Sequence, residues 1–109
     1  MAPYIPEPGD IVWLEFDPQA GHEQAGRRPA LVVSPKSYNS KTGLALCCPL
    51  TTKSKGYPFE VLIEDESSVV LADHIKSLDW KARKAKLKNQ VSKDVLDEVK
   101  LKLQLLIKG

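Results

Sequence analysis

The sequence predicts a small, mainly β domain, a barrel or a sandwich, that carries one amphipathic helix at its C-terminal end. The chain has 109 residues, which is enough for one hydrophobic core and too few for two. Several short apolar runs follow one another with turn-forming residues between them, a spacing typical of small all-β folds rather than of βαβ units. Only the last segment repeats its apolar residues at the spacing of a helix.

The first half of the chain contains three expected strands. Residues 11–16 (IVWLEF) follow a leader that contains Pro and Gly and form the first strand. Residues 29–34 (PALVVS) form the second, and their continuous apolar run indicates burial on both faces. Residues 44–50 form the third strand, after a turn at residues 40–43 (SKTG).

The second half begins with a polar loop over residues 51–57, which leads into a fourth strand at 58–63. An acidic turn at 64–68 (EDESS) follows. Two further strand-like segments cover residues 69–72 and 74–80.

The last part of the chain changes character. Residues 84–90 form a basic loop or a short strand. Ser92 is a suitable N-cap for a helix, and Lys108 with Gly109 suits its end. Between them the apolar residues recur at spacings of three and four, at Leu96, Val99, Leu103 and Leu106. We therefore expect an amphipathic helix packed on the strands.

Composition limits the class of protein. A hydrophobic content of 42% with 28% charged residues is ordinary for a folded domain and excludes a disordered chain. No apolar run is long enough to span a membrane, and the N-terminus lacks the pattern of a signal peptide, so we expect a cytoplasmic protein. Cys47 and Cys48 are neighbours in a strand, so their side chains point to opposite faces and a disulfide between them is not expected. Two cysteines also exclude a metal site of the zinc-finger type.

The charges are unevenly distributed, although the net charge is only +2. Residues 1–26 contain five acidic residues and no Lys or Arg, whereas residues 76–90 contain six basic residues and only one acidic residue, Asp79. Such a basic cluster fits a polyanionic partner, either a nucleic acid or an acidic protein, and it also fits a plain solvated surface.

Residues 21–29 (GHEQAGRRP) combine several groups that phosphodiester chemistry requires. RNA is cleaved when its 2′-hydroxyl attacks the adjacent phosphorus, which needs a proton acceptor, a proton donor and cations for the phosphoryl oxygens. His22 and Glu23 are candidates for proton transfer, and Arg28 is suited to bidentate contact with a phosphate. Thr51 and Thr52 would add hydroxyl groups if their loop lies beside this segment.

Each of these residues also has an ordinary interpretation. His22 and Glu23 are compatible with a solvated surface loop, Arg28 with a structural ion pair, and the threonines with a turn. The lysines at 53 and 55 fit solubilising charges, and the two tryptophans fit the core or an interface, because aromatic side chains mainly supply burial.

Three segments together resemble the MazF/PemK (Kid) family of toxin–antitoxin ribonucleases. They are GDIVWLEFDPQAGHEQAGRRPALVVSP, LTTKSKGYPFEV and VVLADHIKSLDWKAR, which begin at residues 9, 50 and 69. The resemblance runs in order from about Gly9 to the terminal helix and is closest to the MazF branch through residues 51–60.

The resemblance implies one toxin domain over residues 1–109, with an SH3-like β-barrel of the CcdB/PemK type and a C-terminal helix. It implies a homodimer that cleaves single-stranded RNA, including mRNA, at specific sequences without a metal or cofactor, and that thereby inhibits translation and growth. The products would be a 2′,3′-cyclic phosphate and a 5′-hydroxyl, and a co-encoded MazE-like antitoxin would inhibit the reaction.

The resemblance also assigns roles to single residues. Arg28 matches the arginine central to cleavage, Thr51 the threonine paired with it, and Glu23 an acidic residue needed in the MazF branch. Because the pKa of arginine lies above about 12, Arg28 is suited to stabilising the transition state or donating a proton rather than to accepting one. We therefore expect Glu23, with His22, to remove the 2′ proton while Arg28 and Thr51 hold the phosphate.

Two further matches belong to the PemK/Kid branch. His22 matches a histidine used there, at a position where many MazF members carry serine. Asp73 matches an aspartate with a base role, but the arginine expected two residues before it is replaced by Leu71, which favours a site centred on Arg28. The residues expected to contact RNA are His22, Thr52, Lys53, Lys55, Asp73 and Lys76.

A second function is compatible with the same kind of barrel. A CcdB-like inhibitor of DNA gyrase would bind a protein and need no catalytic cluster, so the combination of Glu23, Arg28 and Thr51 speaks against it. A plain SH3-like interaction module is the third alternative, in which these residues would only cover the surface.

Overall fold

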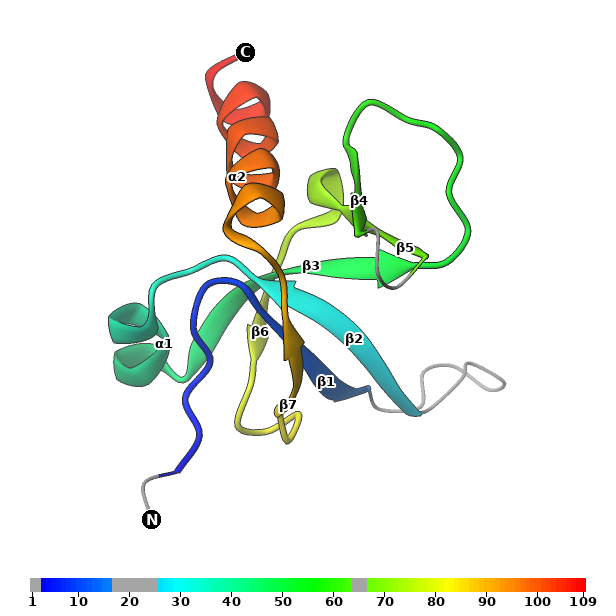
Figure 1. Ribbon diagram of the computed structural model, residues 1–109. Helices are drawn as coiled ribbons and strands as arrows, with labels where there is room; N and C mark the ends of the chain where they lie inside the picture. The colour runs from blue at the N-terminus through cyan, green and yellow to red at the C-terminus, as the bar shows by residue number, and fades with distance from the viewer. Residues whose placement is uncertain (1–2, 17–25, 64–66) are drawn as a thin grey trace.

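The computed structural model describes residues 3–16, 26–63 and 67–109, which form a curled antiparallel sheet with a helix standing against it (Figure 1). The elements follow in the order β1 (Asp10–Phe16), β2 (Gly26–Val32), α1 (Lys36–Thr42), β3 (Leu44–Thr51), β4 (Glu60–Ile63), β5 (Ser68–Leu71), the 3-10 helix η2 (Ala72–His74), β6 (Lys76–Asp79), β7 (Lys86–Gln90) and α2 (Lys93–Lys108).

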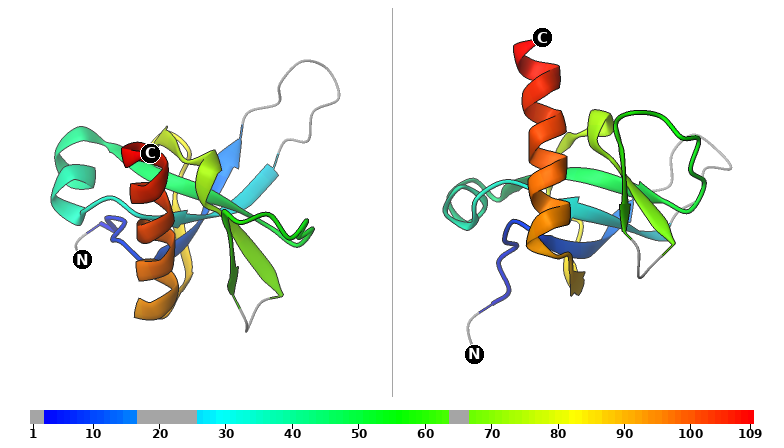
Figure 2. Two further views of the ribbon diagram at one scale, coloured as in Figure 1. Left: turned by 90° about the horizontal axis from the view of Figure 1, so that it is seen from above. Right: turned by 45° about the horizontal axis from the view of Figure 1, so that its top comes forward.

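The sheet has the strand order β4-β5-β3-β2-β1-β7, and β6 pairs with β3. All of the pairings are antiparallel, and β3 holds β6 along its first half and β5 at its end. The strands curl into a half-barrel, with α2 on one side of the sheet and the β4–β5 pair bent toward that side (Figures 1 and 2). The predicted fold class, an SH3-like β-barrel with a C-terminal helix, is confirmed.

The two faces of the sheet each carry a core. Ile11, Leu31 and Cys48 lie in one cluster, into which α2 inserts Val99 and Leu103. The other cluster lies on the opposite face and comprises Val12, Leu14, Ala30, Val32, Ala45, Cys47 and Trp80. Adjacent strand residues therefore enter different cores, as alternation requires. The expected burial of residues 29–34 on both faces and the opposite orientation of the two cysteines are confirmed.

A buried carboxylate joins the N-terminal segment to β7. Asp10 accepts hydrogen bonds from the Tyr4 hydroxyl at 2.6 Å, the Glu7 backbone N–H at 3.0 Å and the Gln90 side-chain amide at 2.8 Å. Burial raises the pKa of Tyr4, and its hydrogen bond to Asp10 raises it further. Since Asp10 is only 1% exposed, these three donors compensate for the water that the carboxylate has lost.

The C-terminal helix was predicted correctly. The Ser92 hydroxyl accepts a hydrogen bond from the Val95 backbone N–H at 3.3 Å, which caps the first turn of α2. The buried residues of the helix, Val99 and Leu103, are two of the predicted apolar positions. No helix within the described residues is long and apolar enough to cross a membrane.

Three elements differ from the expectation. Residues 40–42 of the segment expected as a turn at 40–43 belong to α1, whose only buried side chain is the polar Asn39. The Asn39 amide donates to the Pro6 carbonyl oxygen at 2.9 Å, and the Asn39 carbonyl accepts from the Trp80 indole at 2.9 Å, so tertiary hydrogen bonds rather than an apolar stripe hold this helix. Gly43 ends it at a φ of 74°, a left-handed conformation that suits glycine.

The second difference is the start of β2, which lies at Gly26 rather than at Pro29. The third is the strand expected at 74–80, which begins at Lys76 because η2 occupies the preceding residues. For the basic stretch at 84–90 a loop and a strand were both open, and its residues 86–90 form strand β7.

Candidate functional site

Arg28 lies inside strand β2, opposite Leu14 of β1, and not in the loop before the strand as the sequence suggested. Its neighbour Arg27 lies opposite Glu15 and forms an ion pair with it at 3.6 Å. Because successive side chains of a strand point to opposite faces, the two arginines serve different surfaces. Arg28 is exposed and has no ion-pair partner within the described part of the chain.

Thr51 is the last residue of β3, and the pairing of β2 with β3 relates it to Arg28. Ala30 lies opposite Pro49 in that pairing, which ends there. Arg28 precedes Ala30 by two residues and Thr51 follows Pro49 by two residues, so both side chains are directed to the face that Ala30 and Pro49 share. The fold thus directs two residues that are far apart in the sequence to one face of the sheet.

The loop that follows Thr51 carries the next group of candidates. Thr52, Lys53 and Lys55 are all exposed. The Thr51 hydroxyl oxygen accepts a hydrogen bond from the Lys53 backbone N–H at 3.1 Å, which turns the chain away from the strand. Lys53 and Lys55 therefore lie close to Thr51 along the chain, with both ammonium groups on side chains open to solvent.

Lys76 and Asp73 occupy different parts of the fold. Lys76 lies opposite Cys47, which precedes Thr51 by four residues, so Lys76 belongs to the same face of the sheet as Thr51, roughly 13 Å away along the strand. Asp73 lies in η2, where its carboxylate is 3.8 Å from the His74 imidazole, and it lines a hollow beside α2. Lys76 is therefore placed with Arg28 and Thr51, and Asp73 is not.

The two remaining candidates, His22 and Glu23, lie outside the described residues. No group of three or more His, Cys, Asp or Glu side chains in the described ranges could hold a metal ion. The chemistry that the described residues offer is that of cations and hydroxyl groups: a guanidinium, a threonine hydroxyl and lysine ammonium groups, all suited to binding phosphate oxygens.

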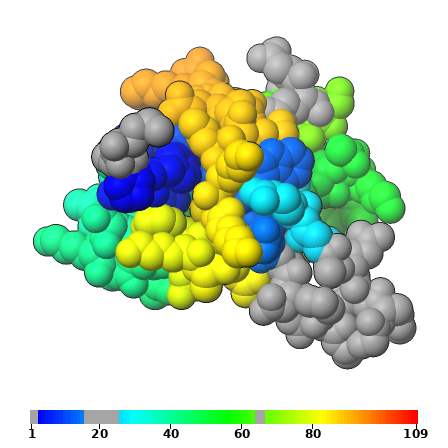
Figure 3. Space-filling model, turned by 90° about the horizontal axis from the view of Figure 1, so that it is seen from below, coloured from blue at the N-terminus to red at the C-terminus, as the bar shows by residue number. Residues whose placement is uncertain are grey.

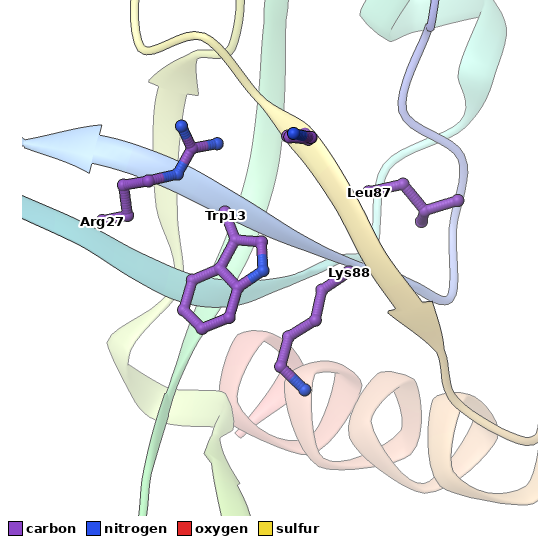
Figure 4. A pocket seen from close by; sticks show the side chains of 5 residues that line it. Trp13, Arg27, Leu87 and Lys88 are labelled. Carbon is purple, nitrogen blue, oxygen red and sulfur yellow. The ribbon is translucent and has the colours of Figure 1, made fainter.

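A basic hollow on the opposite face was missed by sequence reasoning. It has a volume of about 540 Å³ and is lined by Trp13, Arg27, Lys86, Leu87 and Lys88. Figure 4 shows the Trp13 indole between Arg27 of β2 and Lys88 of β7, and the Lys88 ammonium lies 5.8 Å from the centre of the ring. The register of β1 with β7 creates this site, and the only signal in the sequence was the excess of lysines at 76–90.

The segment that supplies these lysines is prominent on the surface. In a view from below, residues 81–92 (yellow to orange) run across the middle of the face, beside the N-terminal segment and β2 (Figure 3). All five residues of β7 are exposed. The hollow is therefore part of a wider basic surface.

The hollow beside α2 that Asp73 lines has a volume of about 490 Å³, is largely apolar and lies between the sheet and the end of α2. Leu46, Ile75, Leu103, Leu106 and Ile107 are among the residues that line it. Ile107 is 83% exposed and Leu106 43% exposed, which is unusual for large apolar side chains that lie next to one another.

Comparison with known proteins identifies the family. Residues 7–107 match the family described as PemK-like, MazF-like toxin of type II toxin–antitoxin system. The chain is 51% identical over 106 residues to the endoribonuclease toxin MazF of Escherichia coli K12, covering 95% of this chain and 96% of that protein. It is 37% identical to the endoribonuclease toxin ChpB of the same organism, covering 93% of each chain.

The fold agrees with the sequence match. A crystal structure of MazE–MazF from Deinococcus radiodurans contains a chain that superposes with a TM-score of 0.91 at 54% identity, covering 97% of this chain and 98% of that one. This likeness extends over both cores and α2. The chain therefore belongs to the PemK-like, MazF-like family of toxins of type II toxin–antitoxin systems.

Proposed function

We propose that this chain is an endoribonuclease toxin that cleaves single-stranded RNA at a site formed by Arg28 and Thr51. The proposal is supported by the β2–β3 register at Ala30 and Pro49, because alternation from that pair assigns Arg28 and Thr51 to one face of the sheet. The names of the similar E. coli proteins, endoribonuclease toxins MazF and ChpB, support the reaction class.

The reaction is an internal transesterification. The 2′-oxygen of the RNA attacks the adjacent phosphorus, the bond from phosphorus to the 5′-oxygen breaks, and the products are a 2′,3′-cyclic phosphate and a 5′-hydroxyl. One proton leaves the 2′-hydroxyl and one is delivered to the departing 5′-oxygen, so the step needs neither a metal nor a cofactor. Negative charge grows on the phosphoryl oxygens, where hydrogen-bond donors and cations lower the barrier.

We assign Arg28 and Thr51 to those phosphoryl oxygens. The planar guanidinium can hold two of them, and the Thr51 hydroxyl adds a further donor. Glu23 is proposed as the acceptor of the 2′ proton, with His22 beside it in the sequence. Thr52, Lys53, Lys55 and Lys76 are proposed to contact the RNA outside the reacting phosphate. The expected contact of Asp73 with RNA is not part of this proposal, because Asp73 lines the hollow beside α2. Splayed bases of single-stranded RNA would be read by contacts in this region, which makes cleavage sequence-specific.

The CcdB-like alternative is not favoured, because the relatives at 51% and 37% identity are named endoribonuclease toxins. Cleavage of mRNA would stop translation and growth, and we propose that it takes place in the cytoplasm. We further propose that residues 1–109 act as one toxin domain, which is consistent with the family match over residues 7–107.

An acidic antitoxin of the MazE type is the proposed protein partner. Three of the similar crystal structures from D. radiodurans are complexes of MazE with MazF. In this chain the basic hollow around Trp13 offers three cations, Arg27, Lys86 and Lys88, around an apolar floor. An extended acidic segment with an occasional apolar side chain would fit such a surface.

A second copy of the chain is the other proposed partner, giving a homodimer. The apolar hollow at the end of α2 supports this proposal, because Leu106 and Ile107 are exposed beside Leu46, itself 36% exposed. Burial of contiguous apolar side chains of this kind is the usual driving force for permanent association.

The decisive experiment is digestion of a mixed-sequence, single-stranded RNA by the purified protein in EDTA. The proposal expects cuts at one short sequence, each leaving a 2′,3′-cyclic phosphate and a 5′-hydroxyl. Intact RNA combined with inhibition of gyrase supercoiling would favour the CcdB-like alternative. If the protein neither cuts RNA nor inhibits supercoiling, only the interaction module is left and the proposed activity is contradicted.

A further inference from the structure

A single carboxylate organises the loop between β3 and β4, where residues 53–57 have no regular secondary structure. Glu60, the first residue of β4, accepts a hydrogen bond from the Ser54 hydroxyl at 2.7 Å. It also accepts from the backbone N–H groups of Lys55 at 3.0 Å and of Gly56 at 3.1 Å. Successive N–H groups that converge on one anion form a nest, and here the occupant is the chain's own side chain.

The backbone of the loop is shaped to reach that carboxylate. Gly56 has a φ of 72°, a left-handed conformation that allows its N–H to turn toward Glu60. The Glu60 backbone N–H in turn donates to the Tyr57 carbonyl oxygen at 3.1 Å, which closes a tight turn before β4. The loop is therefore folded around Glu60 from both sides.

A second anchor ties the end of the loop to the C-terminal helix. The Lys102 ammonium of α2 donates to the Pro58 carbonyl oxygen at 2.6 Å and to the Glu60 carbonyl oxygen at 3.2 Å. Lys102 is also 3.4 Å from Glu98 one turn earlier, and its side chain is only 21% exposed, so it is held in place. The far end of the loop is thereby fixed to α2, while its near end is fixed to β3 by Thr51.

The residues held in this way are those that the proposed function needs. Thr51, Lys53 and Lys55 lie at the near end and the middle of the loop, and none of them touches Glu60 through its own side chain in the hydrogen bonds that shape the loop. We propose that Glu60 is a positioning residue, whose carboxylate holds the loop so that Lys53 and Lys55 meet the RNA phosphates at a fixed distance from Thr51. This inference rests on the proposed RNA cleavage.

The direction in which RNA binding changes when Glu60 is removed distinguishes a positioning role from a purely electrostatic one. The hydrogen bond from Ser54 and those from the loop N–H groups lower the pKa of Glu60, so it is ionised at neutral pH. If Glu60 acted only as a charge, its removal beside a polyanion-binding loop would strengthen RNA binding. If Glu60 positions the loop, its removal weakens binding, because the two lysines lose their fixed geometry.

The test compares Glu60→Gln with Asp97→Asn. Both substitutions are nearly isosteric and remove one negative charge, but Asp97 pairs with Lys93 on an exposed part of α2, away from the loop. The substrate is a single-stranded RNA oligonucleotide containing the site that the wild-type protein cuts in mixed-sequence RNA. For Glu60→Gln we expect KM to rise roughly tenfold and kcat to stay within about threefold, since charged hydrogen bonds are lost but Arg28 remains. Asp97→Asn should leave both constants within about twofold of wild type.

A double-mutant cycle with Lys55→Gln tests whether Glu60 acts on RNA binding through Lys55. If Glu60 had a merely structural role, the effects of the two substitutions on KM would not be coupled. In the wild-type background Lys55→Gln should raise KM about fivefold. It should also reduce the salt dependence of RNA binding by the amount that about one phosphate contact contributes. In the Glu60→Gln background it should raise KM by less than about twofold, because Lys55 is no longer positioned. Amide hydrogen exchange should become faster at Lys55 and Gly56 in Glu60→Gln, while α2 keeps its protection.

The outcomes distinguish this inference from the function on which it rests. If the wild-type protein cuts no RNA, the proposed function fails and the inference fails with it. If the wild type cuts RNA but Glu60→Gln has an unchanged or lower KM, only the positioning role is overturned. Additive effects of Glu60→Gln and Lys55→Gln would overturn it as well, as would unchanged amide exchange in the loop.

Discussion

Arg28 and Arg27 provide a matched pair of substitutions for the proposed active site. They are adjacent, carry the same charge and lie near the start of the same strand, yet they point to opposite faces of the sheet. Arg28→Ala and Arg27→Ala change the net charge equally and remove the same side chain. A difference in their effect on cleavage must therefore come from the face that each arginine serves.

The expected magnitudes follow from the surroundings of each residue. Arg28 is exposed and, among the described residues, unpaired, so Arg28→Ala should change the free energy of unfolding by no more than about 0.5 kcal/mol. Loss of a donor to the developing charge on the phosphate should lower kcat about 100- to 1,000-fold. The Arg27–Glu15 pair is 3.6 Å long, with side chains 40% and 42% exposed. Such a pair contributes about 0.2–1 kcal/mol to stability, and its loss should leave kcat within about threefold.

The assay is steady-state cleavage of an RNA oligonucleotide that contains the selected site, with urea unfolding of each variant as the control for folding. The account predicts a folded Arg28→Ala protein that has almost no activity and a folded Arg27→Ala protein that is active. A kcat for Arg28→Ala within about tenfold of wild type would refute the reasoning. An equal loss of kcat in Arg27→Ala would also refute the reasoning, because cleavage would then not depend on the face of the sheet to which the arginine points.

Three further outcomes follow from the structure. Thr51→Val keeps the shape of the side chain but removes its hydroxyl, so kcat should fall roughly 10- to 100-fold, and an unchanged kcat would exclude Thr51 from the site. Leu106→Glu should weaken homodimer formation at least about 30-fold in sedimentation experiments, since burial of one leucine contributes about 2 kcal/mol, whereas Leu101→Glu, on a residue that does not line the hollow, should not. Burial raises the pKa of Cys47 and of Cys48 to about 12 from an ordinary 9.0, so both thiols should react slowly with a disulfide reagent at pH 8 in the native protein. Because the folded state then keeps protons that the unfolded state releases, the two thiols should not affect the free energy of unfolding below about pH 9 and should lower it between about pH 9 and 12. A variant with alanine at both positions should lose this part of the decline and keep the part that comes from the raised pKa of Tyr4.

Alternation and helical spacing were enough to predict the parts of the fold that bury apolar residues. The continuous run at 29–34 and the repeat through Val99 and Leu103 led directly to β2 and α2. They also placed Cys47 and Cys48 on opposite faces. These predictions succeeded because a single physical requirement, burial of one face or of both, determines the pattern.

The elements that were missed obey a different requirement. Helix α1 buries only Asn39, so no apolar stripe reveals it, and its hydrogen bonds to Pro6 and Trp80 depend on the finished fold. The first residues of β2 are exposed, and two of them, Arg27 and Arg28, are charged. They adopt a strand conformation because β1 pairs with β2 as far as Gly26. Tertiary pairing, which no local pattern records, overrides the local composition there.

The candidate site likewise depends partly on local sequence and partly on tertiary pairing. Residue chemistry and family resemblance pointed to Arg28 and Thr51, but their common face depends on the register of β2 with β3. Glu60 carried no signal as a functional residue, because an acidic residue at the start of a strand has nothing unusual in the sequence. Its role emerges only from the hydrogen bonds that it accepts from the loop.

Cleavage of an RNA with a single 2′-deoxynucleotide at the cut position tests the central claim most directly. The account requires the 2′-oxygen of that nucleotide as the attacking atom, so this one substitution should abolish cleavage while binding changes little. The unmodified RNA, digested in parallel in EDTA, should yield the 2′,3′-cyclic phosphate and the 5′-hydroxyl. Cleavage of the 2′-deoxy substrate at the same position would contradict the mechanism and the roles proposed for Arg28 and Thr51.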